Sequence, residues 1–142
     1  MKKLFPLIIL CVLTINSCGE VKKQDGKEQG KSKIEFENTS FDFGKIAFGS
    51  DGTCVFKFTN TSKESLIVNV VRTSCGCTNP EWPKDPVEPG KSGEINITYN
   101  TRITGKFRKS ITVYCNAVNS PAKLSIMGEV KPETLRSSSS KK

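Results

Sequence analysis

Residues 53–59 of this chain read Thr-Cys-Val-Phe-Lys-Phe-Thr and alternate between two kinds of position. Cys54, Phe56 and Phe58 occupy every second position, while Lys57 and the other intervening residues occupy the positions between them. Because successive side chains of an extended strand point to opposite faces, this spacing predicts a β-strand with one buried face.

The same alternation continues on both sides of this strand, with turn residues between the apolar runs. Residues 93–100 are the clearest case, since Ile95, Ile97 and Tyr99 alternate with polar residues. Further strands are expected near residues 34–36, 41–43, 65–73, 107–116 and 122–130. About seven short strands, with a turn about every ten residues, predict one antiparallel β-sandwich of immunoglobulin type over residues 34–130.

A proline-rich segment, residues 78–90, interrupts this pattern, with prolines at positions 80, 83, 86 and 89. Proline at every third position suits polyproline II, so a rigid connection across the sandwich is expected here. An exposed ligand for a proline-recognising domain is the alternative. Trp82, within this segment, is expected to pack at the edge of the core rather than over the thiols that precede it.

Two cysteines lie one glycine apart in the stretch Arg-Thr-Ser-Cys-Gly-Cys-Thr, residues 72–78. In an extended strand the β-carbons of Cys75 and Cys77 would be about 6–7 Å apart, whereas a disulfide needs roughly 3.5–4.5 Å. Gly76 can adopt a positive φ, and a chain folded in this way would bring the two sulfurs together. Three interpretations stay open: a strand end whose thiols meet other cysteines, a redox or soft-metal site, and two free buried thiols.

The N-terminus carries the features of an export signal. Lys2 and Lys3 make the first three residues a positively charged segment. The apolar run that follows is too short to span a bilayer, and the small residue Ser17 then precedes Cys18. This arrangement resembles the lipobox of bacterial lipoproteins, in which the peptide is cut before a cysteine that becomes acylated. The resemblance implies a signal peptide at residues 1–17, a lipid on Cys18 and loss of Cys11 with the signal. It places the protein in the cell envelope as a membrane-anchored lipoprotein, facing the periplasm or on the outer-membrane surface, and an ordinary secretory signal is the alternative.

The net charge of +8 is concentrated at the two ends of the chain. Residues 34–130 contain 11 Lys/Arg and 10 Asp/Glu, so the predicted domain is nearly neutral. No nucleic-acid partner is therefore expected, because such a surface needs Lys and Arg clustered on the domain itself. Residues 18–33 are expected to be a lipidated cysteine with a flexible tether, and residues 131–142 a disordered basic tail. The basic ends suit an anionic membrane surface, or are simply solvated linker.

Four cysteines, Cys54, Cys75, Cys77 and Cys115, remain in the predicted mature domain. In an immunoglobulin-type sandwich Cys54 would open its strand at the end where residues 65–73 finish, close to the two cysteines that follow them. Cys115 would close its strand at the opposite end, about 20 Å away. A bond from Cys54 to either of its two neighbours would join the sheets, whereas Cys115 is expected to stay apart.

Several short motifs are spread over residues 34–130. They are Phe43-Gly44-x-Ile46-x-x-Gly49, Phe56-x-Phe58-x-Asn60, Ser74-Cys75-Gly76-Cys77-Thr78, Pro89-Gly90 and Ile126-x-Gly128-x-Val130. With these motifs the chain resembles the bacterial domain of unknown function numbered fifteen-seventy-three, and the stretch from Ser74 to Thr78 is the most specific part. The resemblance implies an immunoglobulin-like fold, similar to major sperm protein and periplasmic-chaperone domains and often carried on lipoproteins. It implies no established activity.

The residue types favour a binding role over an enzymatic one. The chain has no histidine, which removes Ser-His and Cys-His nucleophiles and mixed Cys/His zinc sites. We expect a lipid-anchored, non-enzymatic or structural module with no catalytic residue, cofactor, metal or small-molecule substrate. Its expected contacts are the membrane, through the N-terminal lipid, and a protein bound at a sheet edge or at the proline-rich segment. The alternative is a thiol redox or Cu(I)-binding protein that uses Cys75 and Cys77, with Cys54 as resolving thiol or third ligand.

Overall fold

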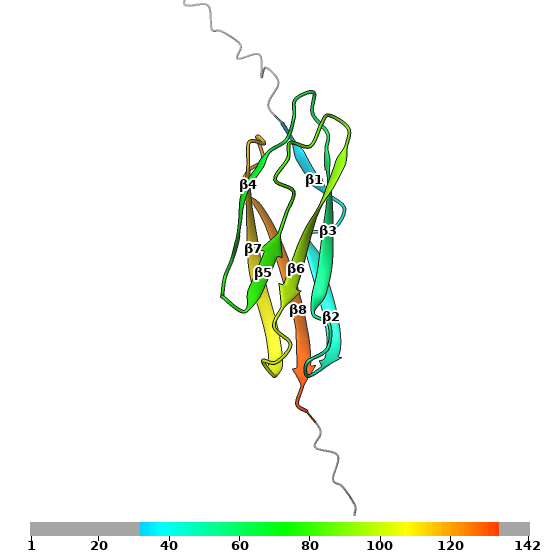
Figure 1. Ribbon diagram of the computed structural model, residues 1–142, viewed down its shortest axis with the longest axis vertical. Coiled ribbons are helices and arrows are strands. Elements are labelled where there is room, and N and C mark those ends of the chain that lie inside the picture. The colour runs from blue at the N-terminus through cyan, green and yellow to red at the C-terminus, as the bar shows by residue number, and fades with distance from the viewer. Residues whose placement is uncertain (1–31, 134–142) are drawn as a thin grey trace, which may run out of the picture.

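The computed structural model describes residues 32–133, which form two four-stranded β-sheets packed face to face (Figure 1). The strands, in chain order, are β1 (Ile34–Phe36), β2 (Ser40–Ala47), β3 (Thr53–Asn60), β4 (Val68–Thr73), β5 (Thr78–Glu81), β6 (Ser92–Tyr99), β7 (Gly105–Cys115) and β8 (Ala122–Lys131). One sheet has the order β1-β3-β6-β5 and the other the order β2-β8-β7-β4. The predicted immunoglobulin-like sandwich is confirmed, with eight strands rather than about seven.

The core lies between the sheets and is filled by every second residue of the inner strands. In β3 the predicted alternation is confirmed, since Cys54, Phe56 and Phe58 are buried while the residues between them are exposed. The fully buried side chains that the other sheet contributes are Ile111, Val113, Ile126 and Val130. The rings of Tyr99 and Phe107 stack with their centroids 3.8 Å apart, which joins β6 to β7 across the core.

One strand pair departs from the predicted antiparallel arrangement, because β2 runs parallel to β8. β1 and β2 are separated only by residues 37–39, where the chain passes from one sheet to the other and keeps its direction (Figure 1). Since the chain changes sheet without reversing, β2 lies alongside β8 in the same direction.

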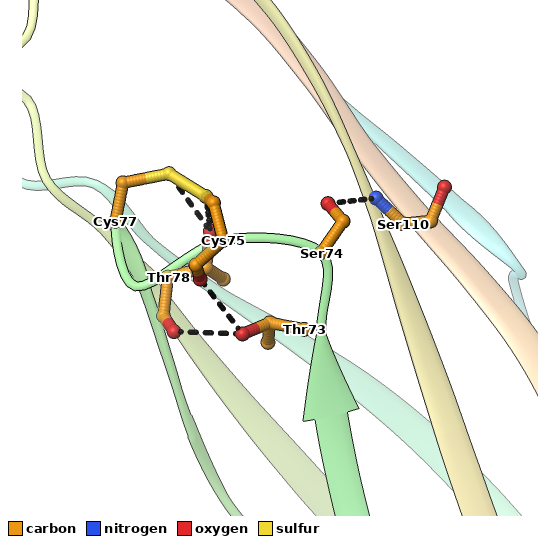
Figure 2. The surroundings of a disulfide bond; sticks show 6 residues. All are labelled: Thr73, Ser74, Cys75, Cys77, Thr78 and Ser110. Carbon is orange, nitrogen blue, oxygen red and sulfur yellow. Dashed lines mark hydrogen bonds between the residues drawn. A yellow bond between two sulfur atoms is a disulfide. The ribbon is translucent and has the colours of Figure 1, made fainter.

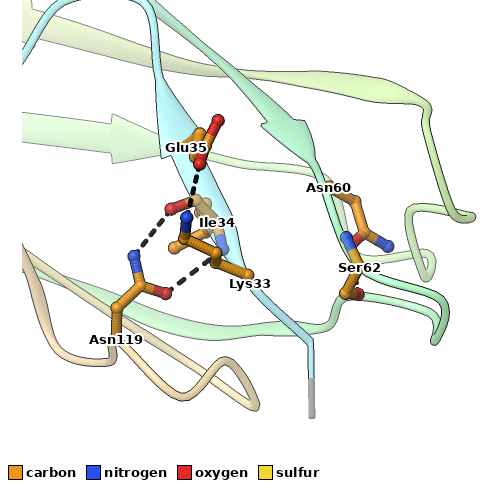
Figure 3. A network of polar contacts seen from close by, with 6 residues as sticks. All are labelled: Lys33, Ile34, Glu35, Asn60, Ser62 and Asn119. Atoms are coloured by element: carbon orange, nitrogen blue, oxygen red, sulfur yellow. Dashed lines mark hydrogen bonds and ion pairs between the residues drawn. The ribbon is translucent and has the colours of Figure 1, made fainter. Parts of the chain in front are cut away.

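β1 is only three residues long, and a side chain from a distant loop holds it in place (Figure 3). Asn119, between β7 and β8, accepts a hydrogen bond from the Ile34 amide at 3.2 Å and donates one to the Ile34 carbonyl at 2.7 Å. The Ser32 hydroxyl donates to the Ser65 carbonyl at 2.8 Å. The first described residues are therefore fixed to the body of the sandwich.

The predicted polyproline connection is wrong for its first residues. Thr78–Glu81 form β5, which pairs antiparallel with β6 and places Pro80 opposite Ile97. Proline is tolerated there because β5 is an edge strand, where one side of the backbone has no neighbouring strand to bond. Further along the segment, Val87 forms an isolated antiparallel bridge with Leu66.

Trp82 packs against the core, as predicted, and its indole N–H donates to the Val68 carbonyl at 3.1 Å. Val68 is the first residue of β4, which begins three residues later than the strand expected over residues 65–73. The Lys84 ammonium lies 3.2 Å from the centre of the Trp82 ring, a cation–π contact. Trp82 thus covers the first part of the β4 edge.

The predictions for the two ends of the chain concern residues that the structure does not describe. They are the signal peptide at residues 1–17, the lipid on Cys18, most of the tether and the tail from residue 134. Within residues 32–133, no helix is long and apolar enough to cross a membrane.

Gly93 is a position where the packing can be tested directly. A Cβ added there would lie 2.5 Å from Cζ of Phe58, a fully buried ring. We expect Gly93→Ala to lower the free energy of unfolding by about 1–3 kcal/mol, as overpacked cores do. Gly76→Ala, where an added Cβ has open space, is the control and should change stability by less than about 0.5 kcal/mol. Equal denaturation midpoints for the two variants would contradict this packing.

Candidate functional site

The Cys-Gly-Cys stretch forms the turn that carries the chain from one sheet to the other (Figure 2). β4 ends at Thr73 in one sheet, and β5 begins at Thr78 in the other. Within this turn, Cys75 and Cys77 are joined by a disulfide, with their Cα atoms 5.3 Å apart. The Cys75–Cys77 bond therefore lies in the connection that carries the chain from β4 in one sheet to β5 in the other. We call Ser74 to Cys77 the disulfide turn.

The sulfurs do not meet in the way that the sequence suggested. Gly76 is not among the described glycines with a positive φ, so the expected left-handed conformation is wrong. The chain instead bends at Ser74 and Cys75 and turns at Gly76 and Cys77, which brings the side chains of the two cysteines to the same side. A Cβ on Gly76 would meet nothing within 4 Å, so the tip of the turn is open to contact from outside.

Two threonine hydroxyls organise the inside of the turn (Figure 2). The Thr73 hydroxyl lies 2.9 Å from the carbonyl of Cys75 and 3.2 Å from the carbonyl of Thr78, both of them acceptors. The buried Thr78 hydroxyl lies 3.7 Å from the sulfur of Cys75 and 3.8 Å from the sulfur of Cys77. The backbone leaves both strand ladders at this point, and these hydroxyls supply polar partners within the turn.

Backbone hydrogen bonds anchor the disulfide turn to both sheets. The Ser74 amide donates to the Ser110 carbonyl at 3.0 Å, and the Ser110 amide donates to the Ser74 hydroxyl at 3.2 Å. On the other side, the Asn100 amide, just after β6, donates to the Cys77 carbonyl at 2.9 Å. Sequence reasoning missed Ser110 and Asn100, because both lie far from the motif along the chain and only strand pairing brings them to it.

Cys54 is not bonded to the disulfide turn, so the possible disulfide from Cys54 to Cys75 or Cys77 does not form. Cys54 is a free, buried thiol on β3. It lies opposite Ile97 of β6, and Pro80 of β5 lies opposite the same residue from the other side. Two strand spacings, about 9–10 Å, therefore separate β3 from β5, beyond the reach of a disulfide. The formation of β5 also places Cys77 beside the sheet of Cys54 rather than opposite it.

The environments of the two free thiols differ from that of the disulfide turn. Burial raises the pKa of the Cys54 thiol to about 11. Cys115 is also free and buried, and it pairs with Val68 at the start of β4, whereas the disulfide turn follows the end of β4. The expected separation of Cys115 from the other cysteines is what the structure shows. Neither thiol is placed to act as a resolving partner for Cys75 or Cys77.

The disulfide closes a very short loop, and this limits how much it can stabilise the fold. In the chain-entropy model a bond that closes a loop of three residues stabilises a fold by about 1.5 kcal/mol, roughly half of what a fifteen-residue loop gives. The Cys75–Cys77 bond therefore acts mainly on the local shape of the turn. Within residues 32–133, no three side chains of His, Cys, Asp or Glu are grouped so that they could hold a metal ion.

Comparison with known protein families shows to which family this chain belongs. A family model described as "Protein of unknown function (DUF1573)" matches residues 34–130. The chain belongs to this DUF1573 family. The predicted resemblance to this family is thereby confirmed over residues 34–130. Among curated protein sequences, none matches the chain.

Solved structures similar to this DUF1573 chain share its fold at low sequence identity. A protein of unknown function from Porphyromonas gingivalis W83 has a TM-score of 0.62 at 17% identity, over 69% of this chain and 46% of its own. The ASH/PapD-like domain 7 of human CEP192 has a TM-score of 0.61 at 12% identity, over 73% of this chain and 89% of its own. The YadV chaperone has a TM-score of 0.52 at 9% identity, over 70% of this chain and 53% of its own. The DUF1573 chain thus spans about half the length of the Porphyromonas protein, and at these identities the likeness concerns the fold alone.

The cysteine pairing gives a direct test of this geometry. Peptide mapping of the non-reduced mature protein should find the peptide with Cys75 and Cys77 lighter by two hydrogen atoms than its reduced form. Alkylation of the folded protein near pH 8 should leave Cys54 unmodified, because it is buried and its pKa is about 11. Alkylation in denaturant is the control and should label both Cys54 and Cys115. A peptide pair joining Cys54 to Cys75 or Cys77 would contradict the structure.

Proposed function

We propose that this chain is a non-enzymatic module of the bacterial cell envelope, held on a membrane by an acylated Cys18, that binds another protein along its β4–β5 side. The observation that carries the proposal is the arrangement of that side. β4 and β5 are edge strands of different sheets, and the rigid disulfide turn connects them. The structure thus presents two strand edges and a fixed turn on one side of the sandwich (Figure 1).

An edge strand is a natural place for a protein to bind. Its outer peptide groups have no neighbouring strand, so an extended segment of a partner can add to the sheet by main-chain hydrogen bonds. β4 has a register shift against β7 only between Val68 and Val70, which leaves Val70 to Thr73 continuous up to the disulfide turn. β2, at the other side of the same sheet, is interrupted in its middle, between Asp42 and Lys45. The β4 edge is therefore the better template for an added strand.

The disulfide turn and Trp82 bound this binding side. Gly76 is exposed at the tip of the turn, and the disulfide with its threonine contacts fixes the backbone around it. Preorganising a binding loop lowers the entropy that is lost on association. At the other end of β4, the half-buried Trp82 ring and the exposed Lys84 stacked on it offer an aromatic and cationic contact of the kind enriched in interfaces.

A second candidate function rests on the same disulfide. Cys75 and Cys77 are bonded to each other and only half-buried, so an external dithiol can reach the bond. Thiolate attack on one sulfur forms a mixed disulfide. This first attack breaks the Cys75–Cys77 bond and releases the other cysteine as a thiol. Attack by the second external thiol on the mixed disulfide then releases the remaining cysteine and leaves the external dithiol oxidised, with two electrons and two protons transferred in all. Rapid exchange with reduced glutathione would favour this candidate, whereas a persistent bond would favour the binding module.

The membrane anchor is tested at Cys18. We expect Cys18→Ser to move the protein from the detergent phase to the aqueous phase in a detergent partition experiment, because acyl chains supply the hydrophobic attachment. Cys11→Ser, inside the predicted signal peptide, is the matched control and should leave the protein in the detergent phase. Mass spectrometry of the mature N-terminus should find an acylated Cys18. Membrane retention of Cys18→Ser equal to that of the wild type would refute the anchor.

Protein binding is tested by placing a photo-crosslinking amino acid in the full-length protein inside cells. At Gly76 and at Asn79, an exposed residue of β5, we expect one crosslinked product of defined mass. Val55, which is 43% exposed on the inner strand β3 of the same sheet as β5, is the matched control and should give no such product. The same product from all three positions, or none from Gly76 and Asn79, would contradict binding on the β4–β5 side.

A further inference from the structure

The outer surface of the sheet β2-β8-β7-β4 gathers positive charge. We call it the basic face. Six exposed basic side chains occupy outward positions of these strands: Lys45, Arg72, Lys106, Arg108, Lys123 and Lys131. The carboxylates on the same face are Asp42 and Glu129. The basic face therefore has a formal excess of four positive charges, whereas residues 34–131 as a whole have 12 Lys/Arg and 10 Asp/Glu, an excess of two.

The outer surface of the other sheet has the opposite sign. Its outward strand positions include one basic side chain, Lys57, and three carboxylates, Glu35, Glu81 and Glu94. The sandwich is thus polarised across its thickness. A charged surface outside the protein would attract one face and repel the other, which orients the domain as well as binding it.

Strand register places four of the six basic side chains and both carboxylates at one end of the basic face, whereas Arg72 and Lys123 lie further along it, where both pair with Thr112. Lys45 of β2 and Lys106 of β7 both lie opposite Glu129 of β8, one on each side. The Lys131 ammonium lies 2.8 Å from a Glu129 carboxylate oxygen. The hydrogen bond from Lys131, together with the charges of Lys131, Lys106 and Lys45, lowers the pKa of Glu129. The Glu129 carboxylate thus lies among the ammonium groups of Lys45, Lys106 and Lys131. Arg108, two residues after Lys106 on β7, is the next outward residue of that strand.

The basic face is broad and shallow. Ser40, Ser125 and Ser110 form a row of small side chains across three strands, because Ser125 pairs with both of the others. A shallow hollow of about 360 Å³ on this face is lined by residues that include Lys106, Arg108 and Glu129. Tyr114, 37% exposed, lies further along β7 from Lys106. Charges spread over four strands without a deep cleft suit an extended anionic surface better than a compact ligand.

We propose that the basic face binds the anionic phospholipid headgroups of the membrane that carries the protein, so that the sandwich lies with this face toward the bilayer. This proposal rests on the proposed function, because the acylated Cys18 is the group that holds the domain at a membrane. Fifteen residues separate Cys18 from Ile34, and a chain of this length reaches at most about 50 Å, so the face stays within reach of the surface. Tethering also raises the local concentration of headgroups around the domain. The β4–β5 side remains at the flank of the sandwich, open to a protein.

The test uses the mature chain from residue 18 with Cys18→Ser, which contains every described residue and the whole core but no acyl chain. It is sedimented with vesicles of phosphatidylcholine alone and of phosphatidylcholine with 30% phosphatidylglycerol, at low and at high salt. We expect binding to the anionic vesicles at least tenfold stronger than to the neutral ones, and its loss at high salt. Because no lipid anchor is present, this result does not depend on whether Cys18 is acylated in cells.

Paired variants assign the binding to the basic face. Each basic residue near an anionic surface contributes about fivefold to binding, so Lys106→Gln with Arg108→Gln should weaken it about 30-fold. Lys57→Gln with Lys63→Gln removes the same charge away from the basic face and should leave binding unchanged. Equal effects of the two pairs, binding that persists in Lys106→Gln/Arg108→Gln, or equal binding to both vesicle types would overturn the proposal. Concentration-dependent self-association without vesicles, lost in the same variant, would reassign the face to a second copy.

Discussion

Close packing of the inward faces of two sheets is the constraint on which the structure depends. Every second residue of the inner strands is buried, and Phe56 and Phe58 of β3 belong to the same core cluster as the buried aliphatic side chains of β7 and β8. Because successive side chains of a strand point to opposite faces, about half of the residues of an inner strand face the core and the other half face solvent. The outward position of the charged side chains and the burial of Cys54 and Cys115 both follow from which half of its strand a residue occupies.

Within residues 32–133 the chain passes from one sheet to the other at five connections, and two of them are built in contrasting ways. Between β1 and β2 it continues in the same direction through residues 37–39, and β2 finishes as a parallel neighbour of β8. Between β4 and β5 it reverses within Ser74 to Cys77, where its backbone leaves both ladders. The disulfide, the Thr73 hydroxyl and the bonds to Ser110 and Asn100 hold this tighter connection. The Ser74–Thr78 stretch, which was expected to be the most specific part of the family resemblance, thus coincides with the reversal.

The two proposed contacts use different surfaces of one sandwich. Protein binding is assigned to the side where β4, β5 and the disulfide turn lie, and membrane binding to the outer face of β2-β8-β7-β4. A domain resting on its basic face would present its acidic face to the surrounding solution and its β4–β5 side along the membrane plane. An anchor, an oriented domain and a lateral binding edge would then act together, because none of them covers another.

Most strands could be predicted from the sequence, because alternation between neighbours such as Phe56 and Lys57 is a local property. β5 could not, since Pro80 argues against a strand until its place at an edge beside β6 is known. The same strand separates Cys54 from the disulfide turn, because β6 lies between β3 and β5. By itself, then, the sequence determined which residues face the core, the motif and the family. Only the tertiary structure decided which strands are neighbours, and with that the cysteine pairing and the separation of charge between the two faces, because these depend on contacts between residues far apart in the chain.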